Sequence, residues 1–437
     1  MVIPHPGAIF LKEVLSVKKS GLKFFALVFS AVLALMCLSG CGNNSSSPVD
    51  YKYSKEFTYV EDETFGYNVY TDHAELKSFF GAATLEVTIP SEVTDPETKK
   101  AKPITVIGKS AFKENTGAKT LNIPDSVIEI KSNAFKNCSG IVTLNFGKNL
   151  KKIGTNAFYG CMSISEIKLP ESLESIGAYA FSGCSTAENL ELANVGQIGD
   201  YAFEKCISVN NITGGDNLVL LGENAFSDTP WFAAQEGEFV TIGKALVKYN
   251  GTANEIELDG KIEGVSNAFA EKDNITKINM PSVKFVCNNA FSGCTALSDI
   301  TLSDDTEFIG YAAFKDTPYI SYLTADENGF TTIGKVIVKY TGSQETITIP
   351  DEITMISDAF SHNETIKKVS LGKSVKWIGA DAFYSCTALR TFVCNEALAY
   401  IDNYALDGTT LTTFDAGSNT YAAYWAKDYG LKNIVYK

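Results

Sequence analysis

The sequence has almost no arginine and very little histidine. Of its 437 residues, 37 are basic, and Arg390 is the single arginine among them. There are three histidines, and 51 acidic side chains outnumber the basic ones, which gives a formal net charge of −14. The guanidinium fork that binds phosphate and sulfate is therefore nearly absent, and the net charge opposes binding to polyanions. This composition excludes a basic nucleic-acid-binding protein.

Motifs for catalysis and for metal binding are also missing. The sequence contains no GxSxG, no HExxH, no phosphate-binding glycine loop and no CxxC pair that could hold zinc. His73 and His362 lie far apart in the sequence, and we expect both at the surface. We predict a protein that is not an enzyme and needs neither a metal nor a cofactor. A glycosidase-like carboxylate pair stays open, because acidic residues cannot be paired from sequence.

The first forty residues have the pattern of a targeting segment. Lysines at positions 18, 19 and 23 precede the run 24–38, which is apolar except for Ser30 and ends at Leu38-Ser39-Gly40-Cys41. A charged start, a short apolar run and a small-residue cleavage site are typical of a signal peptide. The run is shorter than the roughly 20 residues that span a bilayer. We therefore predict a cleaved signal peptide over 1–40, with a transmembrane anchor as the alternative.

The LSGC sequence resembles the lipobox of bacterial lipoproteins. This resemblance implies that Cys41 is alkylated by diacylglyceride and becomes the mature N-terminus. Two acyl chains hold a protein stably on a membrane, where one chain would be marginal. The small polar residues after Cys41 suit a flexible tether over 41–55. We expect an exported protein that is lipid-anchored to the bacterial cell membrane and exposed at the surface.

The dipeptide Ala-Phe recurs through most of the remaining chain. Its phenylalanines are 22 or 23 residues apart, except for two double-length steps of 43 and 46 residues. A fixed period of this length is typical of solenoids of the leucine-rich class. The repeat phenylalanines are Phe112, Phe135, Phe158, Phe181, Phe203, Phe226, Phe269, Phe291, Phe314, Phe360 and Phe383.

One repeat unit runs from Ile164 to Cys184. Ile167 and Leu169 alternate with polar neighbours, which predicts a half-buried strand. Pro170 ends the strand because proline lacks a backbone donor, and the chain then returns to the core before the Ala180-Phe181 turn. Stacked units would place the strands in a parallel sheet with the phenylalanines behind it. A single unit cannot fold alone, so the array needs a cap at each end.

The pattern LxIPxSVxxIGxxAFxxC is found in Leu121–Cys138, where Lys131 replaces the glycine, and in Ile167–Cys184. It resembles the BspA-type leucine-rich repeat of bacterial surface proteins. The resemblance implies an α/β, right-handed leucine-rich-repeat solenoid, mostly β with short helical turns, of about 12 coils of 22–23 residues. It also implies a role in adhesion and protein interaction, with partners that differ between members.

The domain organisation follows from the repeat and its two interruptions. Hairpins predicted around Gly243-Lys244 and Gly334-Lys335 replace the Ala-Phe turn at the double-length steps, and we expect their role to be architectural. The predicted segments are the signal peptide 1–40, the tether 41–55, an N-terminal cap and first repeat 56–104, the solenoid 105–412 with modified coils near 228–258 and 316–349, and a C-terminal cap 413–437.

Six cysteines share one position, three residues after the repeat phenylalanine. Other repeats place small polar residues there, so we predict a ladder of free thiols in a buried slot. Disulfides between adjacent coils are the alternative, although parallel Cβ atoms about 4.8 Å apart are too distant for good geometry. The six are Cys138, Cys161, Cys184, Cys206, Cys294 and Cys386.

The outward-facing strand positions form a polar row of mixed charge. The row lacks the aromatic side chains that stack on sugars or bases. We predict that it binds an unidentified protein ligand; a glycan ligand and a merely solvated sheet are the alternatives. The candidate residues are Asn122, Asn145, Glu166, Lys168, Glu191, Lys277, Asn279, Asp299 and Lys368.

A second candidate surface lies just before the Ile-Gly turn of the later repeats. This position holds Phe285, Phe308, Met355, Trp377 and Tyr400, whereas the early repeats place mostly polar residues there. Stacking would align these side chains in a stripe. An exposed aromatic stripe would mark an interface with a partner or another copy. The alternative is that the stripe packs inside the protein.

Together these patterns predict a lipid-anchored surface protein that mediates protein–protein interaction, with adhesion to host or neighbouring-cell proteins. A carbohydrate-binding or cell-wall-associated module is the first alternative, and a structural spacer without a ligand is the second.

Overall fold

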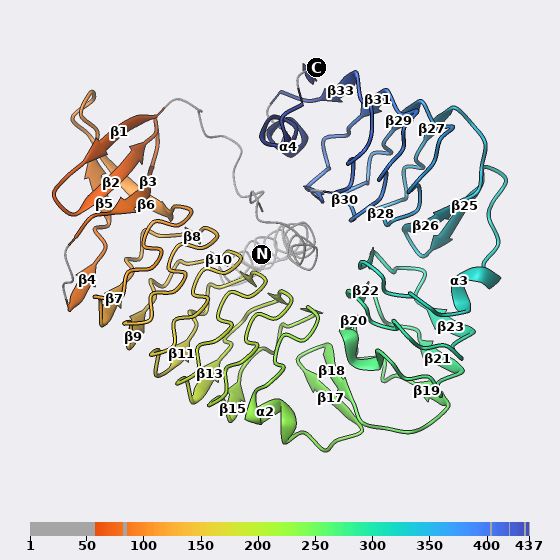
Figure 1. The fold of residues 1–437 in the computed structure, drawn as a ribbon, viewed down its shortest axis with the longest axis horizontal. Helices are drawn as coiled ribbons and strands as arrows, with labels where there is room; N and C mark the ends of the chain where they lie inside the picture. Colours follow the sequence, from red (N-terminus) through yellow and green to blue (C-terminus); the bar gives the residue numbers. More distant parts are fainter. Residues whose placement is uncertain (1–56, 82–84, 403, 419, 432–433, 437) are drawn as a thin grey trace, which may run out of the picture.

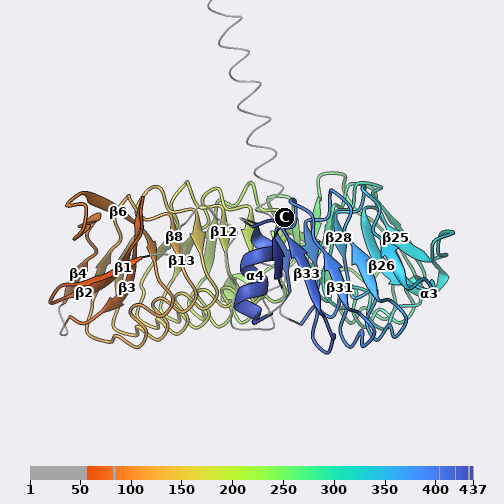
Figure 2. The ribbon, with the colours of Figure 1, turned by 90° about the horizontal axis from the view of Figure 1, so that it is seen from above.

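The protein is a single β-solenoid that curves into an open ring (Figure 1). The structure is a computed structural model, and it describes residues 57–81, 85–402, 404–418, 420–431 and 434–436. Turned by 90°, the ring is a flat band of stacked coils (Figure 2). The predicted signal peptide, the lipidation site Cys41 and the tether lie outside the described residues.

Each coil gives one strand to the outer side of the ring and one short strand to the inner side (Figure 1). In the coil Ile164–Cys184, the outer strand is β11 (Ile167–Lys168) and the inner strand is β12 (Ser175–Ile176). Ile167 and Ile176 are buried, and Pro170 follows the outer strand as its missing donor requires. The two rows of strands therefore enclose a continuous core between them.

Two antiparallel hairpins divide the solenoid into three blocks. The first pairs β17 (Phe239–Ile242) with β18 (Ala245–Tyr249), and the second pairs β25 (Phe330–Ile333) with β26 (Val336–Tyr340). Each hairpin begins a new inner sheet, and the ring bends where the hairpins lie (Figure 1). The hairpins predicted around the two Gly-Lys pairs are therefore present. We name the parts the N-terminal block (57–229), the middle block (230–317) and the C-terminal block (318–436).

The N-terminal block has an inner sheet of order β1-β2-β3-β6-β8-β10-β12-β14-β16, with β5 paired to β6. Its first three strands are antiparallel, and it is parallel from β3 onward along that order. The remaining inner strands are β1 (Thr58–Glu61), β2 (Phe65–Val69), β3 (Ala74–Phe79), β5 (Glu92–Thr94), β6 (Ala101–Ile107), β8 (Glu129–Ile130), β10 (Lys152–Ile153), β14 (Gln197–Ile198) and β16 (Leu220–Leu221). The outer strands are β4 (Glu86–Thr88), β7 (Thr120–Asn122), β9 (Thr143–Asn145), β13 (Asn189–Glu191) and β15 (Asn211–Thr213).

The middle and C-terminal blocks repeat one plan of a short helix, a hairpin and parallel coils. The middle block contains α2 (Pro230–Ala233), the outer strands β19 (Glu255–Glu257), β21 (Lys277–Met280) and β23 (Asp299–Leu302), and the inner strands β20 (Gly264–Val265), β22 (Phe285–Val286) and β24 (Phe308–Ile309), with a 3-10 turn at Asn267–Phe269. The C-terminal block contains α3 (Tyr319–Tyr322), the outer strands β27 (Thr346–Thr348), β29 (Lys368–Ser370), β31 (Thr391–Val393) and β33 (Thr413–Ala416), and the inner strands β28 (Met355–Ile356), β30 (Trp377–Ile378) and β32 (Tyr400–Ile401).

The repeat phenylalanines form a stacked column in the core. Ring centroids of Phe158 and Phe181 are 5.1 Å apart, and those of Phe181 and Phe203 are 5.4 Å apart, with nearly parallel planes. All three side chains are fully buried. A parallel sheet spaces its strands about 4.8 Å apart, so identical rings in successive coils meet face to face. The column thus follows directly from the 23-residue period.

Glycine before the Ala-Phe turn allows neighbouring coils to approach closely. A Cβ atom on Gly177 would lie 2.5 Å from the backbone nitrogen of Thr155 in the preceding coil. That distance is shorter than any normal contact, so the close approach of these two coils needs glycine at position 177.

The C-terminal end is closed by α4 (Tyr421–Tyr429) and β34 (Ile434–Tyr436). Strand β34 pairs in parallel with β33, and Trp425 packs 6.0 Å from Phe414. The helix and strand therefore cover the last coil, which otherwise would expose its apolar face.

The solenoid has about 15 turns, compared with the 12 expected. The difference arises because each hairpin and the N-terminal strands add turns that carry no Ala-Phe pair. Within the described residues, no helix is long and apolar enough to cross a membrane.

We expect Phe181→Ala to lower the free energy of unfolding by about 3 to 5 kcal/mol, because it removes a fully buried ring from the column. Urea denaturation followed by circular dichroism measures the change. The control Ile207→Ala alters a side chain that is 60% exposed and should cost less than about 0.5 kcal/mol. Equal effects of the two substitutions would contradict the column's role.

Candidate functional site

The predicted outer strand face exists as a polar surface on the outside of the ring. Eight of its nine residues lie on outer strands, with Lys168 on the short strand β11, and Glu166 lies directly before β11. The alternation holds, since Ile167 is buried between the exposed side chains of Glu166 and Lys168. In the described part of the chain the face is divided among four outer sheets, with breaks at the two hairpins and between β9 and β11.

Amide side chains form a ladder on the first coils of this face. Asn145 Nδ2 donates to Asn122 Oδ1 at 2.7 Å, and Asn122 Nδ2 donates to Glu86 Oε1 at 2.9 Å and to Thr88 Oγ1 at 3.0 Å. The ladder follows from the parallel register, which places Asn122 beside Asn145. An amide in such a ladder still has a donor or an acceptor for a partner.

Opposite charges meet in two further coil pairs. Lys168 lies 3.1 Å from Glu191, and Lys277 lies 3.0 Å from Asp299. Asp299 raises the pKa of Lys277, first by a hydrogen bond and then by its charge. These side chains are largely exposed, and exposed ion pairs stabilise a fold by only about 0 to 1 kcal/mol. Their charges therefore remain available to a charged partner surface.

The last two predicted residues of this face lie elsewhere in the outer row. Asn279 Nδ2 donates to both carboxylate oxygens of Glu257, at 2.7 and 2.8 Å. Lys368 lies in the C-terminal block, in register with Thr346 and Thr391 on its two neighbouring strands. The structure thus brings the predicted residues together in pairs and ladders within blocks, and not in one continuous site.

The aromatic stripe is buried, so the prediction of an exposed aromatic docking band is wrong. Phe308 and Trp377 have no exposed surface, and Phe285 and Tyr400 are 5% and 6% exposed. Strands β22 and β30 lie on the inner side of the ring (Figure 1), and β24 and β32 are the next strands of the same two inner sheets. The alternative of internal packing is correct.

The reason is the curvature of the solenoid. Phe308 of the middle block and Trp377 of the C-terminal block meet edge to face, with centroids 6.2 Å apart. Leu220 at the end of the N-terminal block belongs to the same core cluster, as do Met355 and Tyr400. The stripe therefore fills the inside of the curve and joins the blocks. Sequence periodicity placed these residues on one side correctly but carries no information on what that side faces.

Two carboxylates on the inner side bind asparagines of another block. Asn288 Nδ2 donates to Asp200 Oδ2 at 3.0 Å, and Asn289 Nδ2 donates to Glu223 Oε2 at 2.6 Å. Asp200 Oδ1 also accepts from the backbone N–H of Glu223 at 2.7 Å. Tyr311 N–H donates to Asn288 Oδ1 at 2.9 Å, which orients the amide with its donors toward Asp200. These bonds span 66 and 88 residues, so no local sequence pattern predicts them.

Burial raises the pKa of two acids on this inner side. The pKa of Asp200 rises to about 7, chiefly because burial disfavours its charged form, although hydrogen bonds from Glu223 and Asn288 oppose the shift. The pKa of Asp402 rises to about 6 for the same main reason. Tyr400 donates to Asp402 Oδ2 at 3.2 Å. The inner side therefore contains acids that titrate near neutral pH.

The six repeat cysteines are free and buried, as predicted. Each thiol donates to the carbonyl of the preceding repeat phenylalanine; Cys138 Sγ, for example, lies 3.0 Å from the Phe112 oxygen. Burial raises the pKa of Cys206 to about 12 and that of Cys294 to about 11. A thiol with so high a pKa is a weak nucleophile, so these residues serve the core.

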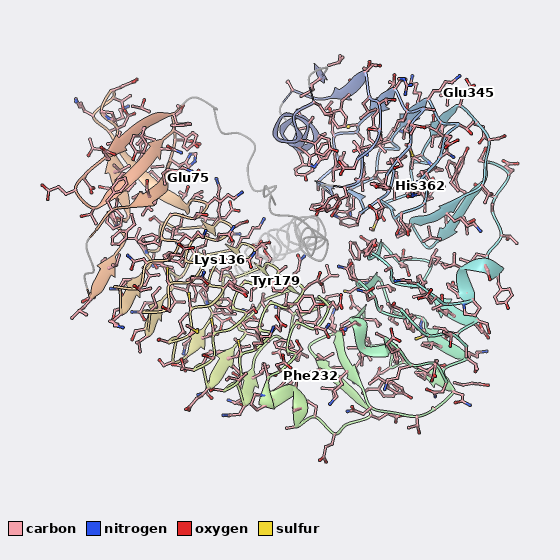
Figure 3. All side chains as sticks on the ribbon, viewed as in Figure 1. Glu75, Lys136, Tyr179, Phe232, Glu345 and His362 are labelled. Atoms are coloured by element: carbon pink, nitrogen blue, oxygen red, sulfur yellow. The ribbon has the colours of Figure 1, made fainter. Side chains whose placement is uncertain are left out.

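The surface location expected for His73 is wrong. Its side chain is buried, stacks on Tyr70 at 4.5 Å and places Nδ1 2.8 Å from Asp72, and burial lowers its pKa. His362, labelled in Figure 3, is exposed, as expected, and meets Tyr384 edge to face. In the part of the chain that the structure describes, no group of three or more His, Cys, Asp or Glu residues could hold a metal ion.

Comparison with protein families matches the chain to the BspA type leucine rich repeat region, in six copies over residues 105–231, 260–360 and 327–425. These ranges cover more than half of the sequence. The chain belongs to the BspA-type leucine-rich-repeat family. The family membership that the repeat pattern indicated is therefore confirmed for this BspA-type protein.

Solved structures of bacterial leucine-rich-repeat proteins are similar to this BspA-type protein. A leucine rich cell surface protein from Faecalibacterium prausnitzii has 21% identity over 88% of this chain and 96% of its own, with a TM-score of 0.37. A protein from Bacteroides ovatus has 21% identity over 87% and 99%, with a TM-score of 0.30. One from Bacteroides capillosus has 31% identity over 27% and 86%, with a TM-score of 0.26. A search of curated proteins gives no match.

We expect the stability of the BspA-type protein to fall as pH rises from about 5 to 8. The raised pKa of Asp200 means that the folded state holds this proton more tightly than the unfolded state, so its contribution is complete at low pH and lost as pH passes about 7. Urea denaturation at several pH values measures the decrease in the free energy of unfolding, and in Asp200→Asn this decrease should be smaller by about 2 to 3 kcal/mol over that range.

The matched control is Asp304→Asn, which alters an exposed carboxylate and should leave the slope unchanged. The absolute stability of Asp200→Asn is not the readout, because the new amide offers one acceptor where the carboxylate offers two. An identical pH slope in Asp200→Asn and the unaltered protein would contradict the assignment.

Proposed function

We propose that this BspA-type protein is a non-catalytic, lipid-anchored surface protein that binds other proteins, with adhesion to host or neighbouring cells as its role. The observation that carries the proposal is the outer strand face. It is exposed, contains charges of both signs and extends over all three blocks. Membership of the BspA-type family supports a surface-exposed interaction role.

The chemistry of the outer face favours a polar protein partner. Ion pairs such as Lys168–Glu191 and Lys277–Asp299 are weak while they remain in water. When a partner surface of complementary charge displaces water, the same groups supply specificity and increase the association rate. Because the aromatic stripe is buried, the outer face is the remaining predicted binding surface.

A lipid anchor at Cys41 would place the ring at the membrane surface, with the acidic body in solvent. The LSGC pattern supports acylation at this thiol, and the polar residues that follow suit a tether. Export fits the family, whose resemblance implies bacterial surface proteins. The free thiols are compatible with export, because the buried ladder is protected from oxidants.

We expect Cys41→Ser to abolish acylation and release the protein from membranes. Triton X-114 partitioning of cell extracts should move the variant from the detergent phase to the aqueous phase. Cys37→Ser, which changes the other cysteine of the targeting segment, should stay in the detergent phase. Retention of Cys41→Ser in the detergent phase would refute the lipidation site and favour a transmembrane anchor.

We expect charge reversal on the outer face to weaken binding about tenfold or more. Full-length protein in detergent is immobilised and screened by label-free binding against matrix proteins and, in parallel, a glycan panel. A saturable protein hit should be lost in the double variant Lys168→Glu, Lys277→Glu, because two charges of the face are inverted.

The control double variant Lys113→Glu, Lys315→Glu makes the same charge change on the Ala-Phe turns, at two exposed positions, and should bind normally. Equal binding by both variants would overturn the assignment of the face. Hits confined to glycans would favour a carbohydrate-binding module, and silence on both panels would favour a structural spacer.

A further inference from the structure

A cavity of about 230 Å³ lies where the first hairpin interrupts the Ala-Phe column. The column stops at Phe226 and resumes at Phe269, and the hairpin supplies Tyr249 beside Phe269 instead, with ring centroids 5.1 Å apart. The replaced turn leaves a gap between two coils. Its lining comes from the end of the N-terminal block, helix α2, strand β18 and the turn before Phe269.

The cavity combines apolar walls with polar groups of one charge sign. Phe226, Phe232 and Val247 supply apolar surface, and Phe232 is labelled in Figure 3. Among the described residues that line the cavity, Lys248 is the one charged residue and none is a carboxylate. The lining itself therefore carries one positive charge, although the chain as a whole carries −14 and the Glu223 carboxylate binds the lining residue Asn224 at 3.1 Å. An anion is favoured here over a cation.

The ammonium group of Lys248 is held in place by two hydrogen bonds and has one N–H donor left for a ligand. Its ammonium donates to the backbone oxygens of Phe232 at 3.3 Å and Gln235 at 3.1 Å, and lies 4.9 Å from the centre of the Phe232 ring. An ammonium has three N–H donors, so these two bonds leave one donor. The two carbonyl bonds fix the charge beside a wall of the cavity without neutralising it.

The other polar groups also retain hydrogen-bonding capacity. The Ser227 hydroxyl donates to the Asn224 oxygen and the Ser266 hydroxyl donates to the Val247 oxygen, which leaves both hydroxyl oxygens as acceptors. Asn267 Nδ2 donates to Asn224 Oδ1 at 3.0 Å, and its second N–H remains. Acceptors and donors of this kind suit the hydroxyl groups of a ligand.

We propose that this cavity binds a small hydroxylated carboxylate of the size of one uronic acid. The carboxylate would pair with Lys248, and the hydroxyl groups would bond to Ser227, Ser266 and Asn267. A volume of about 230 Å³ is below the roughly 300 to 1,000 Å³ of sites for larger ligands, which limits the occupant to a single sugar ring. A free amino acid is disfavoured, because none of the described lining residues is a carboxylate that would receive its ammonium group.

The second hairpin lacks this site and provides an internal control. Lys339 occupies the register position of Lys248, opposite Thr331 as Lys248 is opposite Val240, but its side chain is exposed. The residue directly before the next Ala-Phe pair is Asn267 after the first hairpin and Asp358 after the second hairpin. A carboxylate at that position would repel an acidic ligand, so the proposed binding is confined to the first hairpin.

Isothermal titration calorimetry of the full-length protein in detergent with D-glucuronate tests the proposal, and D-glucose is the neutral comparison. We expect one saturable site for glucuronate and binding of glucose at least about tenfold weaker, since a charged hydrogen bond is lost. Lys248→Gln should weaken glucuronate binding about tenfold or more, whereas Lys339→Gln should leave it unchanged.

Lys248 also holds helix α2, so its replacement could disturb the fold. Asn267→Asp therefore serves as a second variant; it introduces the acid found at the second hairpin and should weaken glucuronate binding by a similar factor. Circular dichroism confirms that each variant is folded. The proposal is overturned if glucuronate does not bind, if glucose binds equally well, or if folded Lys248→Gln and Asn267→Asp bind glucuronate normally. These outcomes are independent of binding at the outer face.

Discussion

The stacking of each coil on the next is the interaction on which the rest of the structure depends. A coil of 22 or 23 residues cannot bury enough apolar surface on its own to offset the entropy of ordering its backbone. The phenylalanine column, the thiol ladder and the close approach at Gly177 all arise because identical side chains recur at the spacing of a parallel sheet. The polar ladders of the outer face have the same origin. The same stacking of coils therefore determines both the packing of the core and the arrangement of polar side chains on the outer face.

The two hairpins turn this linear stack into a curved one. Each starts a new inner sheet, and the aromatic side chains near β24 and β30 then meet across the inside of the curve. Polar bonds add to this junction where Asn288 and Asn289 reach the carboxylates of the N-terminal block. The interruption that bends the solenoid also opens the cavity beside Lys248. Departures from the repeat thus account for the features that distinguish this protein from a uniform solenoid.

The repeat pattern predicted most of the fold but only part of the candidate site. Periodicity and turn residues such as Pro170 determine which side chains face the core, because nearest neighbours along the solenoid are set by the 23-residue period. Periodicity does not determine how successive blocks are inclined to one another. Periodicity therefore predicts on which side of its coil Trp377 lies. It does not predict that Trp377 is buried against Phe308 of another block. The hydrogen bond between Asp200 and Asn288 is not predictable from the sequence either, because it also joins two blocks.

The curvature is the feature that links core, junction and cavity, and small-angle X-ray scattering tests it most directly. The measurement compares the unaltered protein with the double variant Phe308→Ala, Trp377→Ala and with Tyr322→Ala, which changes a side chain that is 68% exposed. If the inner aromatic cluster holds the blocks in a ring, the double variant has a larger radius of gyration with its coils still folded, and Tyr322→Ala does not. An unchanged radius of gyration in the folded double variant would contradict this account.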